Sequence, residues 1–179
     1  MGGVGEERRS LPPTLTEVVH GLVLLAMAAA FGLGSPAFKD GGPIPGRFTC
    51  AGADVSPPLA WSGAPDTTRS FVLVMDDPDA PGGTFLHWLV YDVPPGLRQL
   101  AEDASRRGIA AARQGRNDFG RAGYGGPCPP SGTHHYFFRL EALDVGTVGV
   151  KPGATRDEVE RRMQGHVVGE ATLTGTFAR

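Results

Sequence analysis

Short runs of apolar residues, separated by glycine and proline, dominate the chain and predict strands rather than long helices. The run Ser70 to Met75 is apolar at successive positions, which is typical of a central strand covered on both faces. His134 to Leu143 and Val168 to Phe177 alternate in character, as expected of strands with one face toward a core. Shorter strands are predicted at Phe31 to Ala37, Phe48 to Cys50, Leu59 to Trp61 and His87 to Val93.

Only one helix is well defined by the sequence. Thr155 and Glu158 have the T-x-x-E spacing of a capping box, which predicts a helix over Arg156 to Gln164. Leu97 to Ser105 is long enough for a second, short helix. Six or more strands with so little helix predict a mainly β protein, a two-sheet antiparallel β-sandwich with Greek-key connections.

Residues 1–30 form an N-terminal extension to one domain at 31–179, a length that suits a single core. The stretch Val18 to Leu33 is largely apolar, but it is too short and too rich in alanine and glycine for a firm membrane span. It has three interpretations: a secretory signal segment, a tail, or sequence around a true start at Met27. Acidic residues offset the basic ones before it, and no A-x-A site follows. We therefore expect a tail on a cytoplasmic protein, with export as the alternative.

Charge and cysteine content exclude some classes of function. The formal net charge is −2, which gives no electrostatic basis for binding nucleic acid. Neither Cys50 nor Cys128 belongs to a CxxC pair, so a structural zinc site is not expected. Two ordinary thiols are favoured over one long-range disulfide, because sequence spacing cannot show that two cysteines are close in space.

The most unusual stretch is an acidic loop between two predicted strands. Asp76, Asp77 and Asp79 fall within four residues, and Pro78 and Pro81 stiffen the backbone around them. Three like charges so close together repel one another unless a cation, a proton or hydrogen-bond donors compensate them. The loop is therefore expected to have a partner. Capping of a turn by aspartate would explain one carboxylate more readily than three.

Two histidines each follow a loop rich in glycine and proline. His87 comes after the acidic loop and His134 after the loop Gly123 to Gly132, and each shares a predicted strand face with a tyrosine, Tyr91 or Tyr136. If the two strands are neighbours in register, both imidazoles lie at one end of a sheet. The alternative is that each is a satisfied histidine of the core or rim. Two histidines with an aspartate can also bind a metal, but no HExxH motif supports that interpretation.

Three segments of the sequence resemble a known family. The residues D-P-D-A-P at Asp77 to Pro81, the strand histidine His87, and G-G-P-C-P-P-S-G-T-H-H-Y at Gly125 to Tyr136 are similar to the two signature blocks of the phosphatidylethanolamine-binding protein family. The similarity is greatest to the family's bacterial branch, the Raf-kinase-inhibitor-like proteins. It extends over about Leu33 to Arg179.

The resemblance implies a β-sandwich with a small pocket at one end that accepts phosphate, acetate or a phospho-headgroup. The ligand-binding residues that it implies are Asp77, Pro81, His87, Gly126, Pro129, Pro130, His134 and Tyr136. The chain departs from the family's usual H-R-Y at His135. Because that position has the opposite strand parity to His134, we interpret His135 as a surface residue and expect anion binding to survive.

The leading hypothesis is an anion-binding protein rather than an enzyme. Both histidines and the backbone N–H groups near Gly126 would donate hydrogen bonds to a phosphate-like group, and Asp77 would orient an imidazole or accept from a protonated ligand. The main alternative is an inhibitor of a kinase or protease that acts through the pocket rim. A hydrolase ranks lower, because no G-x-S-x-G motif is present. We expect no catalytic residue, metal or cofactor, and a homodimer stays open.

Overall fold

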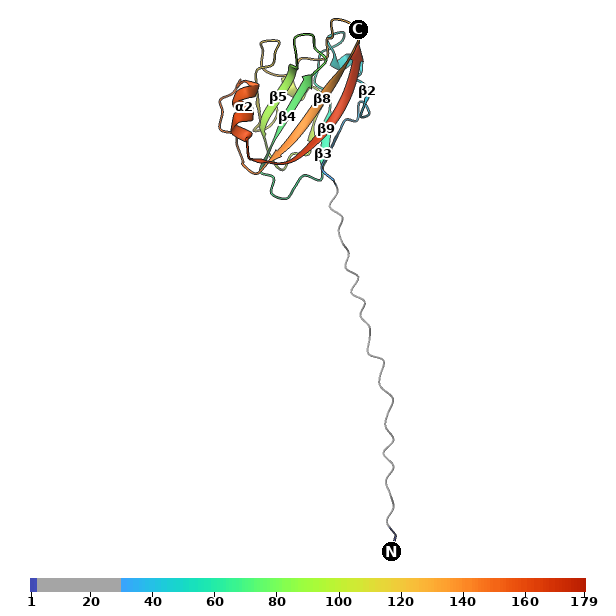
Figure 1. Cartoon of the computed structure of the whole chain (residues 1–179), viewed down its shortest axis with the longest axis vertical. Coiled ribbons are helices and arrows are strands. Elements are labelled where there is room, and N and C mark those ends of the chain that lie inside the picture. Colours follow the sequence, from blue (N-terminus) through green and yellow to red (C-terminus); the bar gives the residue numbers. More distant parts are fainter. Residues whose placement is uncertain (3–29) are drawn as a thin grey trace.

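The computed structural model describes residues 1–2 and 30–179, and in that part the strands form two sheets (Figure 1). The smaller sheet has the order β1 (Gly32–Gly34), β3 (Leu59–Ser62), β6 (Gln99–Leu100). The larger sheet has the order β2 (Gly42–Pro43), β9 (Val167–Ala178), β8 (Thr133–Leu143), β4 (Ser70–Asp77), β5 (Phe85–Val93), β7 (Arg113–Gln114). Short helices are η1 (Gly46–Phe48), α1 (Ala104–Arg107) and α2 (Arg156–Met163). The predicted sandwich is confirmed, with one short parallel pair, β2 and β9, among antiparallel neighbours.

The apolar stretch at 18–33 falls mostly outside the described residues, as does nearly all of the predicted extension. Among the residues that are described, no helix has the length and apolar character needed to cross a membrane.

Strand β4 is the centre of the larger sheet, because β8 and β5 pair with it on its two sides. Every residue of β4 is buried, as its apolar sequence predicts. Phe71, Leu73 and Met75 belong to the core between the two sheets, whereas Val72 and Val74 belong to a second core. Two faces of one strand thus support two separate apolar clusters.

The second core lies on the outer face of the larger sheet, beneath α2. Val159 and Met163, the apolar pair predicted from their spacing, are both buried in it. The predicted capping box is present: the carboxylate of Glu158 accepts a hydrogen bond from the Thr155 N–H (2.8 Å), and the Thr155 hydroxyl accepts one from the Glu158 N–H (3.4 Å). Figure 1 shows α2 beside the strands of this sheet. The helix therefore covers the face opposite the small sheet.

Three local predictions need correction. No strand forms at Phe48 to Cys50: Phe48 ends the 3-10 turn η1, which is closed by the Thr49 N–H to Gly46 carbonyl bond (3.1 Å), and a bend and turn follow. The predicted strand from Phe31 to Ala37 is reduced to the three residues of β1. Leu97 to Ser105 contains β6 and the start of α1 rather than one helix.

A β-bulge in β5 changes which residues share a face. Met75 pairs with Trp88 and Asp76 pairs with Leu86, so His87 has no residue opposite it. The ring of His87 and that of Trp88 consequently both face the core between the sheets, while Tyr91 lies in the outer core. The prediction that His87 and Tyr91 share a face is wrong, because strict alternation does not survive the extra residue.

The prediction of two free thiols is also wrong. Cys50 and Cys128 form a disulfide across 78 residues, with their Cα atoms 5.4 Å apart. The N–H of Cys50 also donates to the carbonyl of Pro127 (3.1 Å), so the chain after η1 is attached to the loop before β8 by a covalent bond and a hydrogen bond. Their proximity is a product of the tertiary fold, which the spacing of two cysteines does not reveal.

Candidate functional site

The three carboxylates of the acidic loop do not share a partner. Asp76 and Asp77 end β4, and consecutive strand residues point to opposite faces. Asp76 is paired with arginines on the α2 side, Asp77 with a histidine on the side between the sheets, and exposed Asp79 with His135 (2.7 Å). Each carboxylate therefore has its own cationic or hydrogen-bonding partner, and this relieves the repulsion expected from the sequence. In the described residues no group of three or more metal-binding side chains is found.

Asp77 and His134 form a buried pair at the end of the sheet. The Asp77 carboxylate accepts a hydrogen bond from His134 Nδ1 at 2.7 Å, and the two residues are 3% and 7% exposed. Its other oxygen accepts the Asp79 N–H (2.9 Å), so the turn-capping role is real for this one carboxylate. An ionised carboxylate only accepts, so Nδ1 carries the hydrogen and Nε2 is left for another partner.

His87 has the same tautomer through a different acceptor. Its Nδ1 donates to the carbonyl of Gly125 at 2.7 Å, and the Gly125 N–H donates back to the His87 carbonyl at 3.0 Å. Burial lowers the pKa of His87 below its ordinary value, and the Gly125 carbonyl and Asp77 only partly oppose this effect. The ring is therefore neutral near pH 7, with an accepting lone pair on Nε2.

Tyr136 joins the two histidines into one cluster. Its ring meets that of His87 edge to face, with centroids 5.2 Å apart, and its hydroxyl is buried without a well-formed hydrogen bond among the described residues. Burial, together with the nearby Asp77 carboxylate, raises the pKa of Tyr136 well above its ordinary value. The hydroxyl is thus a protonated donor next to two imidazoles. The convergence predicted for His87, His134 and Asp77 at one end of the sheet is what the structure contains.

Of the loop N–H groups predicted as donors near Gly126, that of Gly126 itself is not available to a ligand. That N–H donates to Asp54 Oδ1 at 2.6 Å, so it is already used within the protein. A Cβ at this position would lie 2.4 Å from the Phe48 carbonyl oxygen, which explains the glycine by close packing. The three prolines predicted for the site differ in exposure: Pro129 is buried, whereas Pro81 and Pro130 are exposed.

Phe119 is a neighbour of the cluster that the sequence analysis missed. It is 44% exposed, and its ring lies edge-on to those of Phe85 (4.8 Å) and His87 (5.3 Å). The guanidinium of Arg121 lies 5.8 Å above it and is itself paired with Asp54 (3.0 Å). The sequence could have indicated it only as a single aromatic residue in the polar, glycine-containing segment between Gly108 and Gly123. Phe119 places a fixed apolar surface beside His87.

The opposite face carries a dense set of charges instead. Asp76 is 2% exposed and accepts hydrogen bonds from Arg139 and from Arg156 Nη1 (3.1 Å). On the same face Glu141 lies directly across from Glu170 in the β8–β9 register. Burial and then the Glu170 carboxylate raise the pKa of Glu141 to about 7. Asp76 thus joins β4 to Arg139 of β8 and to Arg156 of α2, which holds the helix to the sheet. One buried oxygen of Glu141, Oε2, has no hydrogen-bond partner among the described residues.

Comparison with known proteins gives one consistent result. Residues 34–178 match the family described as phosphatidylethanolamine-binding protein. A UPF0098 protein of Aquifex aeolicus is 50% identical over 148 residues, which cover 81% of this chain and 86% of that protein. A Mycobacterium tuberculosis protein named "Putative lipoprotein LppC" is 40% identical over 180 residues, which cover 98% of this chain and 87% of that protein.

Solved structures agree with this result. The crystal structure of Chlamydia trachomatis CT736, described as "a Putative PhosphatidylEthanolamine-Binding Protein (PEBP) Homolog", is 40% identical and superposes with a TM-score of 0.79, covering 84% of this chain and 98% of that one. That of E. coli YbcL, described as a member of the mammalian PEBP family, is 36% identical with a TM-score of 0.79, covering 84% and 99%.

Proposed function

Because this chain belongs to the phosphatidylethanolamine-binding protein family, we propose that it binds small anions, such as phosphate esters and carboxylates, at the cluster of Asp77, His87, His134 and Tyr136. The observation that carries the proposal is the shared tautomer of the two buried imidazoles. Each has its Nδ1 hydrogen donated to the protein, at 2.7 Å, which leaves Nε2 for a ligand. The proposal is one of binding and not of turnover.

The tautomers require that a proton is bound together with the anion, either on the ligand or on an imidazole. A neutral imidazole can only accept at Nε2, so it suits a protonated oxygen of the ligand, or it must itself take up a proton to donate. Tyr136 adds a hydroxyl donor that needs no such change. Asp77 by itself would repel an anion. Its hydrogen-bond partner is His134, and a protonated His134 would balance the negative charge of Asp77. Binding is therefore coupled to proton uptake.

Calorimetry with acetate tests this coupling. Acetate stays ionised above about pH 6, so any change in affinity there comes from the protein. Because burial lowers the pKa of His87, the ring is neutral near pH 7, and we expect affinity to fall as pH rises between about pH 6 and pH 8. Titrations in buffers of different ionisation enthalpy give the number of protons taken up.

Variants on one strand supply the control. His134→Ala should abolish binding of acetate, phosphate and phosphoethanolamine, whereas His135→Ala, on the exposed side of β8, should preserve it. Binding that does not vary with pH, or a native protein that binds none of these anions, would show the proposal to be incorrect.

We further propose that the protein works in an oxidising compartment, which revises the expectation of a cytoplasmic protein. The Cys50–Cys128 disulfide favours export, since such bonds are rare in reducing cytosol. A relative over nearly the whole chain is named a lipoprotein, which agrees. Alkylation of thiols in acid-quenched cells, followed by mass spectrometry, should find both cysteines protected. Free thiols in the native host would contradict export.

A second function, inhibition of a kinase or protease through the pocket rim, is favoured by the exposed and firmly held ring of Phe119. Exposed aromatic residues are common centres of protein interfaces. Assays against purified kinases and proteases should then show inhibition that Phe119→Ala removes while acetate binding is retained. Absence of inhibition by the native protein, or inhibition that Phe119→Ala leaves intact, would count against it.

A further inference from the structure

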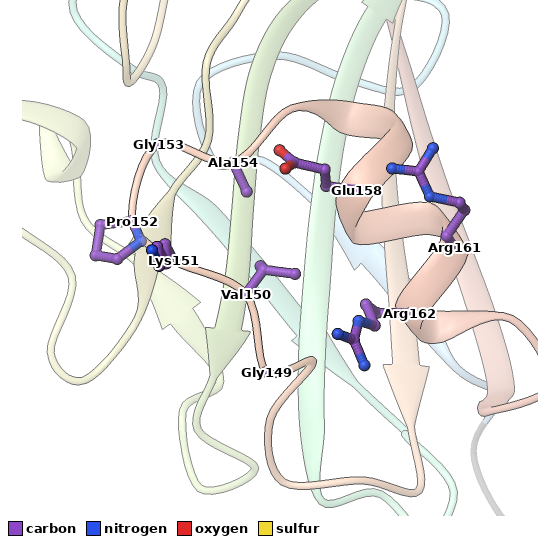
Figure 2. Close-up of a pocket in the computed structure, with 9 residues that line it drawn as sticks. All are labelled: Gly149, Val150, Lys151, Pro152, Gly153, Ala154, Glu158, Arg161 and Arg162. Carbon is purple, nitrogen blue, oxygen red and sulfur yellow. The ribbon is translucent and has the colours of Figure 1, made fainter.

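A cavity lies on the face of the larger sheet that is turned away from the imidazoles. It measures about 580 Å³ and is lined by the loop 149–154 and by residues of α2 (Figure 2). Val148, Ala154 and Val159, which border this region, belong to the outer core rather than to the core between the sheets. The cavity is therefore separated from the imidazole cluster by the thickness of the sheet.

Its walls carry an excess of positive charge. Lys151, Arg161 and Arg162 line the cavity, and none of them forms an ion pair within 30–179, the part of the domain that the structure describes. The one carboxylate, Glu158, is committed to capping α2 through the Thr155 N–H (2.8 Å) and hydroxyl (3.0 Å). Three positive charges against one negative charge leave a surplus of about two.

Both walls are fixed before any ligand binds. On the loop side, the Val150 carbonyl accepts a hydrogen bond from Arg113 (2.9 Å), and the Gly153 N–H donates to the Gln114 carbonyl (3.1 Å). On the helix side, Val159 is fully buried. A ligand would thus have to order the charged side chains but not the backbone that carries them, which limits the entropic cost of binding.

We propose that this cavity is a second anion site, which takes a small molecule bearing at least two phosphate-like charges. Figure 2 shows Arg162 on the side of α2 that faces the loop at Gly149 and Val150. Guanidinium groups match phosphate geometry with paired donors, and the volume is that of a small-molecule site. An extended polyanion such as nucleic acid is disfavoured by the overall charge of −2.

The two sites differ in a way that an experiment can separate. Arginine and lysine keep their charge across the physiological range, so binding here does not require proton uptake by the protein. Because its cations are exposed, this site should instead weaken steeply as salt is added. The inference does not depend on the proposed function, since no side chain is shared between the two sites.

Calorimetry with inorganic pyrophosphate at low salt is the test. In His134→Ala, which removes the imidazole site, pyrophosphate should still bind. Adding Lys151→Ala and Arg162→Ala should weaken it at least about tenfold, while Lys39→Ala, which removes an exposed cation elsewhere, should not. Amide shifts of the native protein on pyrophosphate addition should include residues 149–154, which gives a readout without any variant.

Two results would overturn the second site. One is pyrophosphate binding that the Lys151 and Arg162 changes leave intact. The other is native protein whose amides at 149–154 do not shift at saturating pyrophosphate. If acetate fails to bind at the imidazoles but the loop amides shift, the proposed function fails and the second site stands.

Discussion

Asp76 and Asp77 are consecutive, buried and acidic, yet they belong to different parts of the molecule. Asp76 faces α2 and is held by Arg139 and Arg156, whose charges cannot be removed near neutral pH. Asp77 faces the space between the sheets, and its one side-chain partner among the described residues is His134, while its other oxygen accepts the Asp79 N–H. The first carboxylate is fully compensated by permanent cations, while the second is paired with a ring that can gain or lose a proton.

The acidic loop therefore contains one carboxylate with a structural role and one at the candidate site, although its sequence suggests a single function. A carboxylate between two guanidinium groups has no group left for a ligand. A carboxylate on the Nδ1 of an imidazole fixes the tautomer and leaves Nε2 open. The predictions below test whether the two sides of the loop are as independent as this contrast implies.

The largest effect is expected from the disulfide between Cys50 and Cys128, which attaches the loop before β8. Replacing Cys50 and Cys128 together with serine releases a constraint across 78 residues, which should lower the free energy of unfolding by about 4 kcal/mol. Urea denaturation measures the free energy of unfolding, and reduction of the native protein should cause the same decrease. A loss of less than about 1 kcal/mol would mean that the remaining contacts of the loop already fix it.

The second largest effect on stability is expected on the Asp76 side. Asp76→Asn leaves Arg139 without its carboxylate partner and Arg156 with Glu160 alone. Because both arginines are partly exposed, the cost should be about 2 to 3 kcal/mol, below that of a fully buried pair. Acetate affinity of the folded protein should not change. A loss of affinity as large as that of His134→Ala would show that the two faces are coupled through the strand end.

Much of this architecture was predictable because it depends on local patterns. The fully apolar β4, the alternating β8 and β9 and the capping box at Thr155 each contain their own signal. The bulge at His87 left no such signal, since nothing in the sequence of β5 marks an unpaired residue. As a result Tyr91 was assigned to the wrong face while His87 was still placed at the correct end.

The site was predictable as a cluster but not as a set of hydrogen bonds. Motif resemblance named His87, His134 and Asp77, and the fold brings them together. It also named Gly126, and the hypothesis used the N–H groups near this residue as donors, whereas the Gly126 N–H itself donates to Asp54, 72 residues earlier. Phe119 was missed for the same reason: contacts between distant segments are set by the tertiary fold and not by spacing.

A smaller effect on the Asp76 side concerns pH. Because the pKa of Glu141 is raised to about 7 in the folded protein from 4.5, the fold favours the protonated form, and stability should fall as pH rises between about 4.5 and 7. Groups that face it are Glu160, Glu170, Arg139 and Arg156. Glu141→Gln should raise the free energy of unfolding by about 1 to 2 kcal/mol at pH 8 and little at pH 4.

Urea denaturation at the two pH values checks this, and Asp66→Asn, which removes an exposed carboxylate, is the matched control. An equal gain from Glu141→Gln at both pH values would mean that the carboxyl does not titrate in this range.

The smallest expected effect is on the Asp77 side and concerns the ligand. Asp77→Asn keeps an oxygen that can accept from His134 Nδ1, but it removes the charge that balances the proton taken up with an anion. Acetate affinity at about pH 5.5 should fall about fivefold, which is about 1 kcal/mol, and the dependence on pH should become shallower. Asp79→Asn, whose carboxylate pairs with exposed His135, should change neither quantity. If Asp77→Asn also left the pH profile unchanged, the contrast between Asp76 and Asp77 would be one of position only, and proton coupling would have to come from His87.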